Sequence, residues 1–193
     1  MKIGVDIDEI CVEFAKGYLM KYNEKYGRIS SFENLFSYNL WEPLELTKQE
    51  AVDLADEFYE SDYFQNIQIL DGAKESLTEL AKDNEITFIT SRPIKLKGKT
   101  ESFIKSNFPE FSFKLIFSND FFSQGNLSKA EICLEEGISL LIEDNKDYSV
   151  SCADKGVKVI LFDKPWNKGF EYENITRVKG WKEALEVLSL YAN

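Results

Sequence analysis

Short apolar runs alternate along the chain with stretches in which apolar residues recur every three or four positions. Five runs have the length and the β-branched or aromatic content of buried strands, and they cover residues 2–7, 85–90, 114–118, 139–143 and 157–162. Helical spacing predicts helices over about residues 73–82, 98–108, 148–155 and 180–191, and another from residue 128. Strands that alternate with helices are typical of a parallel sheet covered on both faces. We therefore predict an α/β, Rossmann-like fold.

Two segments carry a complete signal for the start of a helix. Thr47 is followed three residues later by Glu50, and Ser128 is followed in the same way by Glu131. In this pattern the hydroxyl accepts from the N–H three residues on, and the Glu side chain reaches back to the first N–H. We therefore expect helices directly after Thr47 and Ser128.

The segment from residue 14 to residue 70 interrupts the alternation. It contains no good strand, is rich in aromatic residues, and has no clean periodicity over residues 28–46. We predict that residues 14–70 form a small helical cap inserted after the first strand. Residues 1–13 and 71–193 then form the core domain.

A helix is expected at the start of this segment, from about residue 10 to residue 26. It places Phe14, Tyr18 and Tyr22 at four-residue spacing and is followed by Gly27, a common helix stop. Aromatic residues at this spacing share one helix face, so we interpret them as packing inside the cap.

Composition and charge exclude several classes of protein. The chain of 193 residues has a net charge of −11, which argues against a surface that binds a nucleic-acid polymer. It has no histidine, so catalysis by an imidazole base and zinc sites with histidine ligands are excluded. The three cysteines are far apart, so no disulfide framework or zinc cluster is expected. Chemistry must then depend on carboxylates, lysines, hydroxyls or a hard metal ion.

The chain also lacks the features of a membrane or secreted protein. No apolar run approaches the roughly 20 residues that cross a bilayer, and the start MKIGVDID lacks the basic and then apolar layout of a signal peptide. We expect a cytoplasmic protein with no membrane partner. Whether it forms a homodimer is left open.

Polar residues follow four of the predicted strands. In a sheet of this kind, ligands bind at the carboxyl ends of the strands. Each residue alone would be interpreted as a helix cap, a turn or a surface charge, whereas their joint order indicates a site. They are Asp6 and Asp8 after the first strand, Thr90, Ser91 and Arg92 after the second, Lys129 after the third, and Glu143, Asp144 and Asp147 at the fourth.

These residue types are suited to a metal ion and a phosphate. Asp6 and Asp8 are two positions apart, so both can reach one ligand, and a hard cation such as Mg²⁺ would relieve the repulsion between them. Asp144 would add a further oxygen ligand. Lys129 would neutralise a phosphate oxygen, and the Thr90 hydroxyl and nearby turn N–H groups would donate to the others.

The sequence resembles the haloacid dehalogenase superfamily of phosphatases over nearly its whole length. The similarity rests on GVDIDEI from Gly4, ITSRPIK from Ile89, LSKAEI around Lys129 and LIEDNKDY from Leu141. The resemblance implies a sheet of that superfamily's type with a cap and a Mg²⁺-dependent phosphatase. It assigns the nucleophile to Asp6, the acid and base to Asp8, phosphate binding to Thr90, Ser91 and Lys129, and the metal to Asp6, Asp8, Asp144 and, as an open question, Glu143.

Within that superfamily, the chain is similar to the small bacterial nucleotidases related to the 5'(3')-deoxyribonucleotidases. The segment LFDKPWN from Leu161 contributes to this similarity. The resemblance implies that the substrate is a nucleoside monophosphate, and Trp41 in the aperiodic part of the cap is our candidate for stacking on its base. One position departs from the pattern, because Glu9 stands where the deoxyribonucleotidases usually have glycine.

Three alternatives remain open at this point. The substrate would in the first case be another small phosphorylated metabolite. In the second, the chain would be a phospho-accepting signalling domain, although Asp8 and the aromatic insertion argue against this. In the third, Glu9 would block turnover and leave a binding protein.

Overall fold

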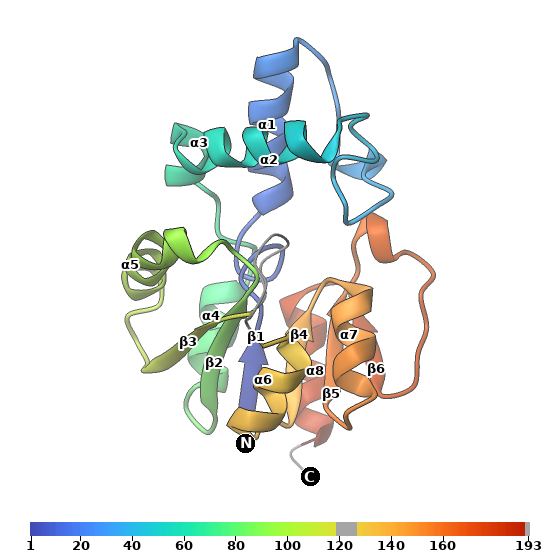
Figure 1. Ribbon diagram of the computed structural model, residues 1–193. Helices are drawn as coiled ribbons and strands as arrows, with labels where there is room; N and C mark the ends of the chain where they lie inside the picture. Colours follow the sequence, from blue (N-terminus) through green and yellow to red (C-terminus); the bar gives the residue numbers. More distant parts are fainter. Residues whose placement is uncertain (119–126, 192–193) are drawn as a thin grey trace.

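The computed structural model describes residues 1–118 and 127–191. Its centre is one sheet of six parallel strands in the order β3-β2-β1-β4-β5-β6 (Figure 1). The flanking strands β2 and β4 therefore bring their carboxyl ends to the same edge of the sheet as β1. This confirms the predicted α/β fold. The strands are β1 (Lys2–Val5), β2 (Glu85–Thr90), β3 (Phe113–Phe117), β4 (Leu140–Glu143), β5 (Lys158–Phe162) and β6 (Ile175–Val178).

Helices cover both faces of the sheet. Figure 1 shows α6 and α7 in front of the strands and α4 behind them. The core clusters agree, because one contains residues of α4, α5 and α8 and the other residues of α6 and α7. The bounds of these helices are α4 (Ala73–Leu80), α5 (Lys97–Asn107), α6 (Lys129–Glu136), α7 (Lys146–Ala153) and α8 (Trp181–Tyr191).

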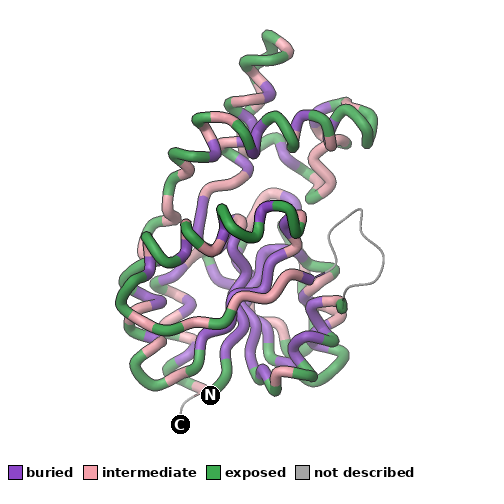
Figure 2. The backbone as a smooth tube through the Cα atoms, turned by 60° about the vertical axis from the view of Figure 1, so that its left-hand side comes forward, coloured by how far each residue is buried: buried purple, intermediate pink, exposed green. Residues whose placement is uncertain are grey.

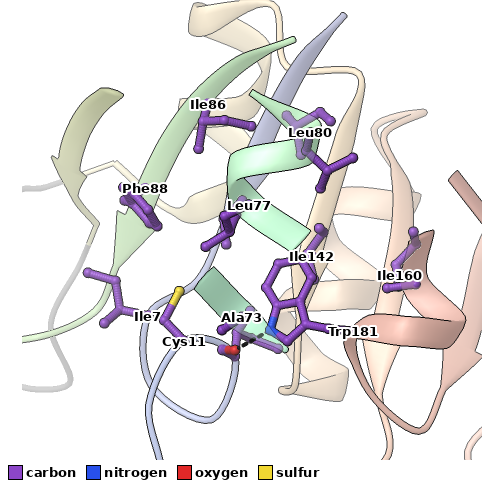
Figure 3. Packing of buried hydrophobic residues seen from close by; sticks show 14 of the residues in the cluster. Ile7, Cys11, Ala73, Leu77, Leu80, Ile86, Phe88, Ile142, Ile160 and Trp181 are labelled. Atoms are coloured by element: carbon purple, nitrogen blue, oxygen red, sulfur yellow. Dashed lines mark hydrogen bonds between the residues drawn. The ribbon is translucent and has the colours of Figure 1, made fainter. Parts of the chain in front are cut away.

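The core between the sheet and the helices α4 and α8 supports the loop that follows β1. Figure 3 shows Leu77 and Trp181 packed beside Ile142 of β4. The buried Trp181 indole N–H donates to the carbonyl of Ile10 at 2.8 Å, drawn as a dashed line in Figure 3. The last helix thereby holds the loop that carries the aspartates.

The chain leaves the sheet earlier than the sequence predicts. The strand β1 ends at Val5 rather than at Ile7, and α1 (Phe14–Tyr26) begins after the predicted start. The N–H groups of Cys11 and Val12 both donate to the carbonyl of Ile7, at 2.8 and 3.2 Å, which folds this segment into a turn. Its apolar residues are buried in the core without being helical.

Several short elements have no counterpart in the sequence prediction. The strand β6 has four residues and lies at the edge of the sheet. Such a strand is too short for its alternation to be distinctive. The other unpredicted elements are α3 (Asp62–Gln65) and the single 3₁₀ turns η1 (Phe32–Asn34), η2 (Ile94–Leu96) and η3 (Pro165–Asn167).

Both predicted helix starts are confirmed. Thr47 precedes α2 (Lys48–Tyr59), and its side chain accepts from the Glu50 N–H while Glu50 accepts from the Thr47 N–H. Ser128 and Glu131 make the same reciprocal pair at the start of α6.

The helices α1, α2 and α3 lie above the carboxyl edge of the sheet (Figure 1). They enclose an apolar cluster that includes Tyr18 and Tyr22 of α1 and Phe58 of α2, and that extends to Leu96 and Trp166 outside these helices. The Tyr22 hydroxyl donates to the carbonyl of Leu44 at 3.0 Å. Figure 2 shows that this part of the chain is largely exposed or intermediate, whereas the central strands of the sheet are mainly buried.

Two chain segments connect these helices to the sheet, and they lie side by side. Val12 forms an antiparallel bridge with Ile69, and the Glu13 N–H donates to the carbonyl of Gln68 at 2.9 Å. The division into a core and a cap at residues 13 and 70 stays a prediction. Among the described residues, every helix is too short or too polar to cross a lipid bilayer.

Candidate active site

The candidate site lies where β1, β2 and β4 end. Asp6 follows β1, Thr90 is the last residue of β2, and Glu143 is the last residue of β4, with Asp144 next. The Asp6 N–H donates to the carbonyl of Ile142 at 3.0 Å, which fixes Asp6 beside β4. Adjacent parallel strands thus bring residues far apart in sequence to one edge of the sheet.

Three carboxylates form what we call the acidic cluster, which consists of Asp6, Glu143 and Asp144. One oxygen of each lies within 4.8 Å of the others. Lys129, the first residue of α6, points its Nζ into this cluster, 2.7 Å from Asp6 Oδ1 and 2.8 Å from Glu143 Oε2. All four side chains are buried, and Lys129 pairs with two of the three acids.

The burial of so many charges shifts their pKa values. Burial raises the pKa of Asp6 although Lys129 opposes the shift, and burial raises the pKa of Glu143 to about 7. Burial and the adjacent Glu143 and Asp6 charges raise the pKa of Asp144 well above its usual value. Burial lowers the pKa of Lys129, but Asp6 and Glu143 outweigh it and the net shift is upward. The acidic cluster is therefore short of positive charge.

The acidic cluster fits a hard divalent cation. Mg²⁺ prefers oxygen ligands and is usually held by one or two carboxylates together with water and phosphate. The three clustered oxygens are near enough to contact one ion, and its charge would offset the repulsion between them. Only oxygen ligands are present in the acidic cluster, which disfavours zinc.

Asp8 does not join the acidic cluster through its side chain. Its carboxylate pairs with Arg92, whose Nε and Nη2 lie 2.9 and 2.6 Å from the two Asp8 oxygens. The Arg92 guanidinium is buried, also reaches Thr100 at 3.3 Å, and lies 5.2 Å from the ring centroid of Phe64 in α3. If Asp8 contributes a ligand to a metal site, the ligand would therefore be its backbone carbonyl. This role of Asp8 stays a prediction.

The turn after β2 lies beside these aspartates. Thr90 is buried, and its Oγ1 accepts from the Arg92 N–H at 3.1 Å. The Ser91 and Ser118 hydroxyl oxygens are 2.9 Å apart, and Ser91 lines the pocket described below. The role of Thr90 and Ser91 in phosphate binding stays a prediction.

Glu9 is held in an unusual backbone conformation by two partners. Its φ of 63° lies in the left-handed region, which favours glycine. Glu9 Oε1 accepts from the Ala15 N–H at 2.7 Å, and Oε2 lies 3.0 Å from Lys164 Nζ. Both oxygens of this buried carboxylate are thus occupied at the junction between α1 and the segment after β5.

The segment after β5 supplies contacts that the sequence analysis did not assign. The Trp166 indole N–H donates to Asp144 Oδ2 at 2.9 Å. The Asn167 side-chain amide donates to the backbone carbonyls of Asp144 and Phe162, at 2.8 and 2.7 Å. The signal that would have found these residues is their position, since they follow the end of a fifth parallel strand.

A pocket lies between the sheet edge and the cap helices. Asp6, Asp8 and Asp144 line it from below, and Trp41 and Lys48 line it from the cap. The half-buried Trp41 ring lies 5.3 Å from Lys48 Nζ. The surface lining the pocket is mainly apolar, which suits a ligand with a charged end and a flat, weakly polar end.

The sequence and the fold were compared with known proteins. The family model described as "5' nucleotidase, deoxy (Pyrimidine), cytosolic type C protein" matches residues 1–193. A relative from Halalkalibacterium halodurans, named "Putative nucleotidase", is 26% identical over 185 residues, which is 95% of this chain and 90% of the relative. A nucleotidase from Clostridium acetobutylicum is 29% identical over 115 residues, or 60% of this chain and 56% of that protein.

Solved structures show the same fold. A haloacid dehalogenase-like hydrolase from Streptococcus pneumoniae has a TM-score of 0.66 at 15% identity, covering 98% of this chain and 97% of its own. A protein of this type from Bacillus subtilis, solved with bound magnesium, has a TM-score of 0.61 at 16% identity, covering 97% of both chains. The chain therefore has the fold of haloacid dehalogenase-like hydrolases and belongs to the family described as "5' nucleotidase, deoxy (Pyrimidine), cytosolic type C protein".

Proposed function

We propose that this protein is a Mg²⁺-dependent phosphomonoester hydrolase that acts through an aspartyl-phosphate on Asp6, with nucleoside monophosphates, and deoxyribonucleotides among them, as substrates. The observation that carries the proposal is the acidic cluster, in which Lys129 pairs with Asp6, and from which Asp6 and Asp144 line a largely apolar pocket. These residues could supply a nucleophile, a cation site and a phosphate-binding lysine at the same edge of the sheet.

The proposed reaction has two steps. First, an Asp6 oxygen attacks the phosphorus in line, the ester P–O bond breaks, and Asp8 gives its proton to the leaving oxygen. Second, Asp8 takes a proton from water, the water oxygen attacks the phosphorus, and the bond between Asp6 and phosphorus breaks. Phosphate is released, and both aspartates return to their starting states.

The remaining residues hold the phosphoryl group while its charge moves. Lys129 is already 2.7 Å from Asp6 and can neutralise an oxygen on the transferred group. The Thr90 hydroxyl and the Ser91 N–H would donate to the others. Asp6, Asp144, Glu143 and the Asp8 carbonyl would hold the metal. When bound, Mg²⁺ supplies charge neutralisation at the phosphoryl oxygens.

The lining of the pocket supports a nucleotide as the substrate. Trp41 faces the pocket, while the buried cap cluster is built from other side chains such as Tyr22, Leu54 and Phe58. An aromatic ring stacked on a base contributes about 1–3 kcal/mol, which a bare sugar phosphate cannot gain. Glu9 does not argue against turnover, because Ala15 and Lys164 already occupy its oxygens.

The test is phosphate release from a panel of nucleoside monophosphates, sugar phosphates and p-nitrophenyl phosphate. The wild-type protein should release phosphate with Mg²⁺ and stop in chelator. Asp6→Asn should be folded but inactive, because an amide is a poor nucleophile. Asp147→Asn is the matched control. Asp147 lies in α7, shortly after the end of β4, but it is exposed and outside the acidic cluster, so this variant should keep the wild-type activity.

Each other outcome has a defined meaning. Appreciable turnover by Asp6→Asn, or full activity in chelator, would contradict the mechanism. A preference for sugar phosphates would support the phosphatase activity but contradict the proposal that the substrate is a nucleotide. A stable phosphoprotein that forms from a phosphodonor without releasing phosphate would indicate a signalling domain instead.

A further inference from the structure

We propose that Trp166 is a positioning residue for the metal: its indole N–H orients the Asp144 carboxylate so that the carboxylate is presented to Mg²⁺. The inference rests on the metal site of the proposed function, but not on the identity of the substrate. It concerns a side chain that neither contacts phosphate in the proposed mechanism nor belongs to the acidic cluster.

The geometry shows how Trp166 would do this. Its Nε1 lies 2.9 Å from Asp144 Oδ2, and both residues are buried. An indole N–H is only a donor, so it occupies a lone pair of Oδ2 and cannot itself bind the cation. With Oδ2 held, rotation of the carboxylate is restricted and Oδ1 has a defined direction. Hydrogen bonds of this kind to metal-binding carboxylates commonly set metal affinity.

The backbone of the same segment is held to Asp144 as well. Asn167 donates to the Asp144 carbonyl at 2.8 Å and to the Phe162 carbonyl at 2.7 Å. These hydrogen bonds of Asn167 fix the chain next to Trp166 at the end of β5. A side chain anchored in this way at its base and at its tip is suited to hold Asp144 in one orientation.

The ring of Trp166 also contacts the cap. Its centroid lies 5.6 Å from that of Phe32 and 6.4 Å from that of Tyr38, both in edge-on arrangements. Trp166 lines the pocket as well. The ring of Trp166 is part of the apolar cluster that contains the cap residues, which accounts for its burial. Packing of the ring does not require its N–H to reach Asp144, so the hydrogen bond points to a second role.

The first experiment measures Mg²⁺ binding directly by following amide signals of ¹⁵N-labelled protein during a titration with MgCl₂, without substrate. Trp166→Phe keeps an aromatic ring but removes the N–H. It should raise the Mg²⁺ dissociation constant by about 10–100-fold, the usual effect of losing such a partner. A dissociation constant within tenfold of the wild-type value, in a variant with a dispersed native spectrum, would overturn the inference.

Trp181→Phe is the matched control. It also removes a buried indole hydrogen bond, the one to the Ile10 carbonyl at 2.8 Å, but does not contact Asp144. We expect it to lower stability and to weaken Mg²⁺ binding less than Trp166→Phe does, because the loop that Trp181 holds carries Asp6 but not Asp144. Equal weakening of Mg²⁺ binding by both variants would show a general loss of core packing and would also overturn the inference.

A second measurement titrates the wild-type protein with MgCl₂ and needs variants only to assign its signals. The chain has three tryptophans, which give three indole N–H signals that Trp41→Phe and Trp181→Phe assign by elimination. The Trp166 signal should move along the Mg²⁺ binding curve, while the Trp181 signal should not. A Trp166 signal whose position does not change on addition of Mg²⁺ would overturn the inference. If the wild-type protein binds no Mg²⁺, the metal site of the proposed function fails together with it.

Discussion

At the scale of single residues, each of the three acids in the loop after β1 has a charged partner from a different part of the chain. Asp6 pairs with Lys129 of α6, and Asp8 pairs with Arg92 after β2. Glu9 pairs with Lys164 after β5. Neighbouring acids in one short loop are thereby aimed in different directions. This separation is what allows Asp6 and Asp8 to have different roles in the proposed reaction.

Arg92 can be tested as the residue that orients Asp8. Arg92→Met removes the charge that holds Asp8, and we expect turnover of an alkyl phosphate to fall on the order of 10²-fold, a typical cost of a misplaced catalytic group. Turnover of p-nitrophenyl phosphate should fall less, because its leaving group needs no proton. Asp8 is a quarter exposed, so its unpaired charge can be hydrated and the fold should persist.

The control for this comparison is Arg177→Met. Arg177 makes a similar charged pair with Asp163, at 2.7 Å, but outside the pocket. Steady-state kinetics on both substrates should match the wild-type protein. An equal fall on both substrates in Arg92→Met would mean that Arg92 only supports the fold.

The metal-free protein should also show a pH dependence that comes from Glu143. Burial raises the pKa of Glu143 from 4.5 to about 7, so between these values the folded protein holds a proton that the unfolded chain has released. The free energy of unfolding should therefore decrease as pH rises through this window and level off above it. Mg²⁺ should remove the decrease, because the ion binds the deprotonated cluster.

Thermal unfolding in chelator and in Mg²⁺, across that pH window, measures this effect. Glu143→Gln has no proton to lose, so the Tm of the wild-type protein relative to this variant should fall as pH rises. Exposed carboxyls such as Glu50 and Glu131 do not produce this trend. Hydrogen bonds lower their pKa values, so their contributions to the free energy of unfolding change with pH only below the window from 4.5 to about 7. A constant difference in Tm would contradict the assignment.

At the scale of secondary-structure elements, the two capping boxes are the places where local sequence most directly determines structure. Thr47→Ala and Ser128→Ala should each lower the free energy of unfolding by about 1 kcal/mol, because an N–H in the first turn loses its acceptor. In a chain of this size the Tm should fall by about 2–4 °C for each kcal/mol. Thr47→Ser keeps the acceptor, and a loss as large as that of Thr47→Ala would show that the hydroxyl is not the cause.

The elements that the sequence predicted correctly are those with strong local signals. The strand Glu85–Thr90 and the helices after Thr47 and Ser128 have clear alternation or complete caps. The strand Ile175–Val178 was missed because four residues at a sheet edge carry little alternation. The turn between Val5 and α1 was taken partly for strand and partly for helix, since burial there comes from tertiary packing.

The same distinction applies to the site. The polar residues at strand ends could be listed from the sequence because the topology of a parallel sheet places strand ends together. Their pairing could not, because Arg92 lies 84 positions from Asp8 and Trp166 lies 22 positions from Asp144. Which side chain reaches which acid depends on how the elements pack, and no local pattern records that.

At the scale of the whole molecule, the pocket is shared between the sheet edge and the cap, so the cap should affect substrate choice more than chemistry. Trp41→Ala should lower kcat/KM for a nucleoside monophosphate by about tenfold or more, which corresponds to about 1.4 kcal/mol of lost stacking. Activity on p-nitrophenyl phosphate should change little, because its phosphate end is held by the sheet edge. Steady-state kinetics on the two substrates measures the difference.

Phe36→Ala provides the control on the same part of the cap. Phe36 is 67% exposed and does not line the pocket, so both substrates should be turned over as by the wild-type protein. Equal losses on both substrates in Trp41→Ala would instead show that Trp41 holds the cap in shape.

The paired segments that join the cap to the sheet have a consequence for how such a protein can change over evolution. Val12 and Ile69 pair with each other, so the chain leaves the sheet and returns to it at adjacent positions. The segment between these two residues is therefore attached to the sheet at one place, like a side branch. A branch attached in this way can lengthen, shorten or be exchanged while the strand order and Asp6 stay in place. New substrates can thus be acquired by rewriting one continuous stretch of the gene, without altering the machinery beneath it.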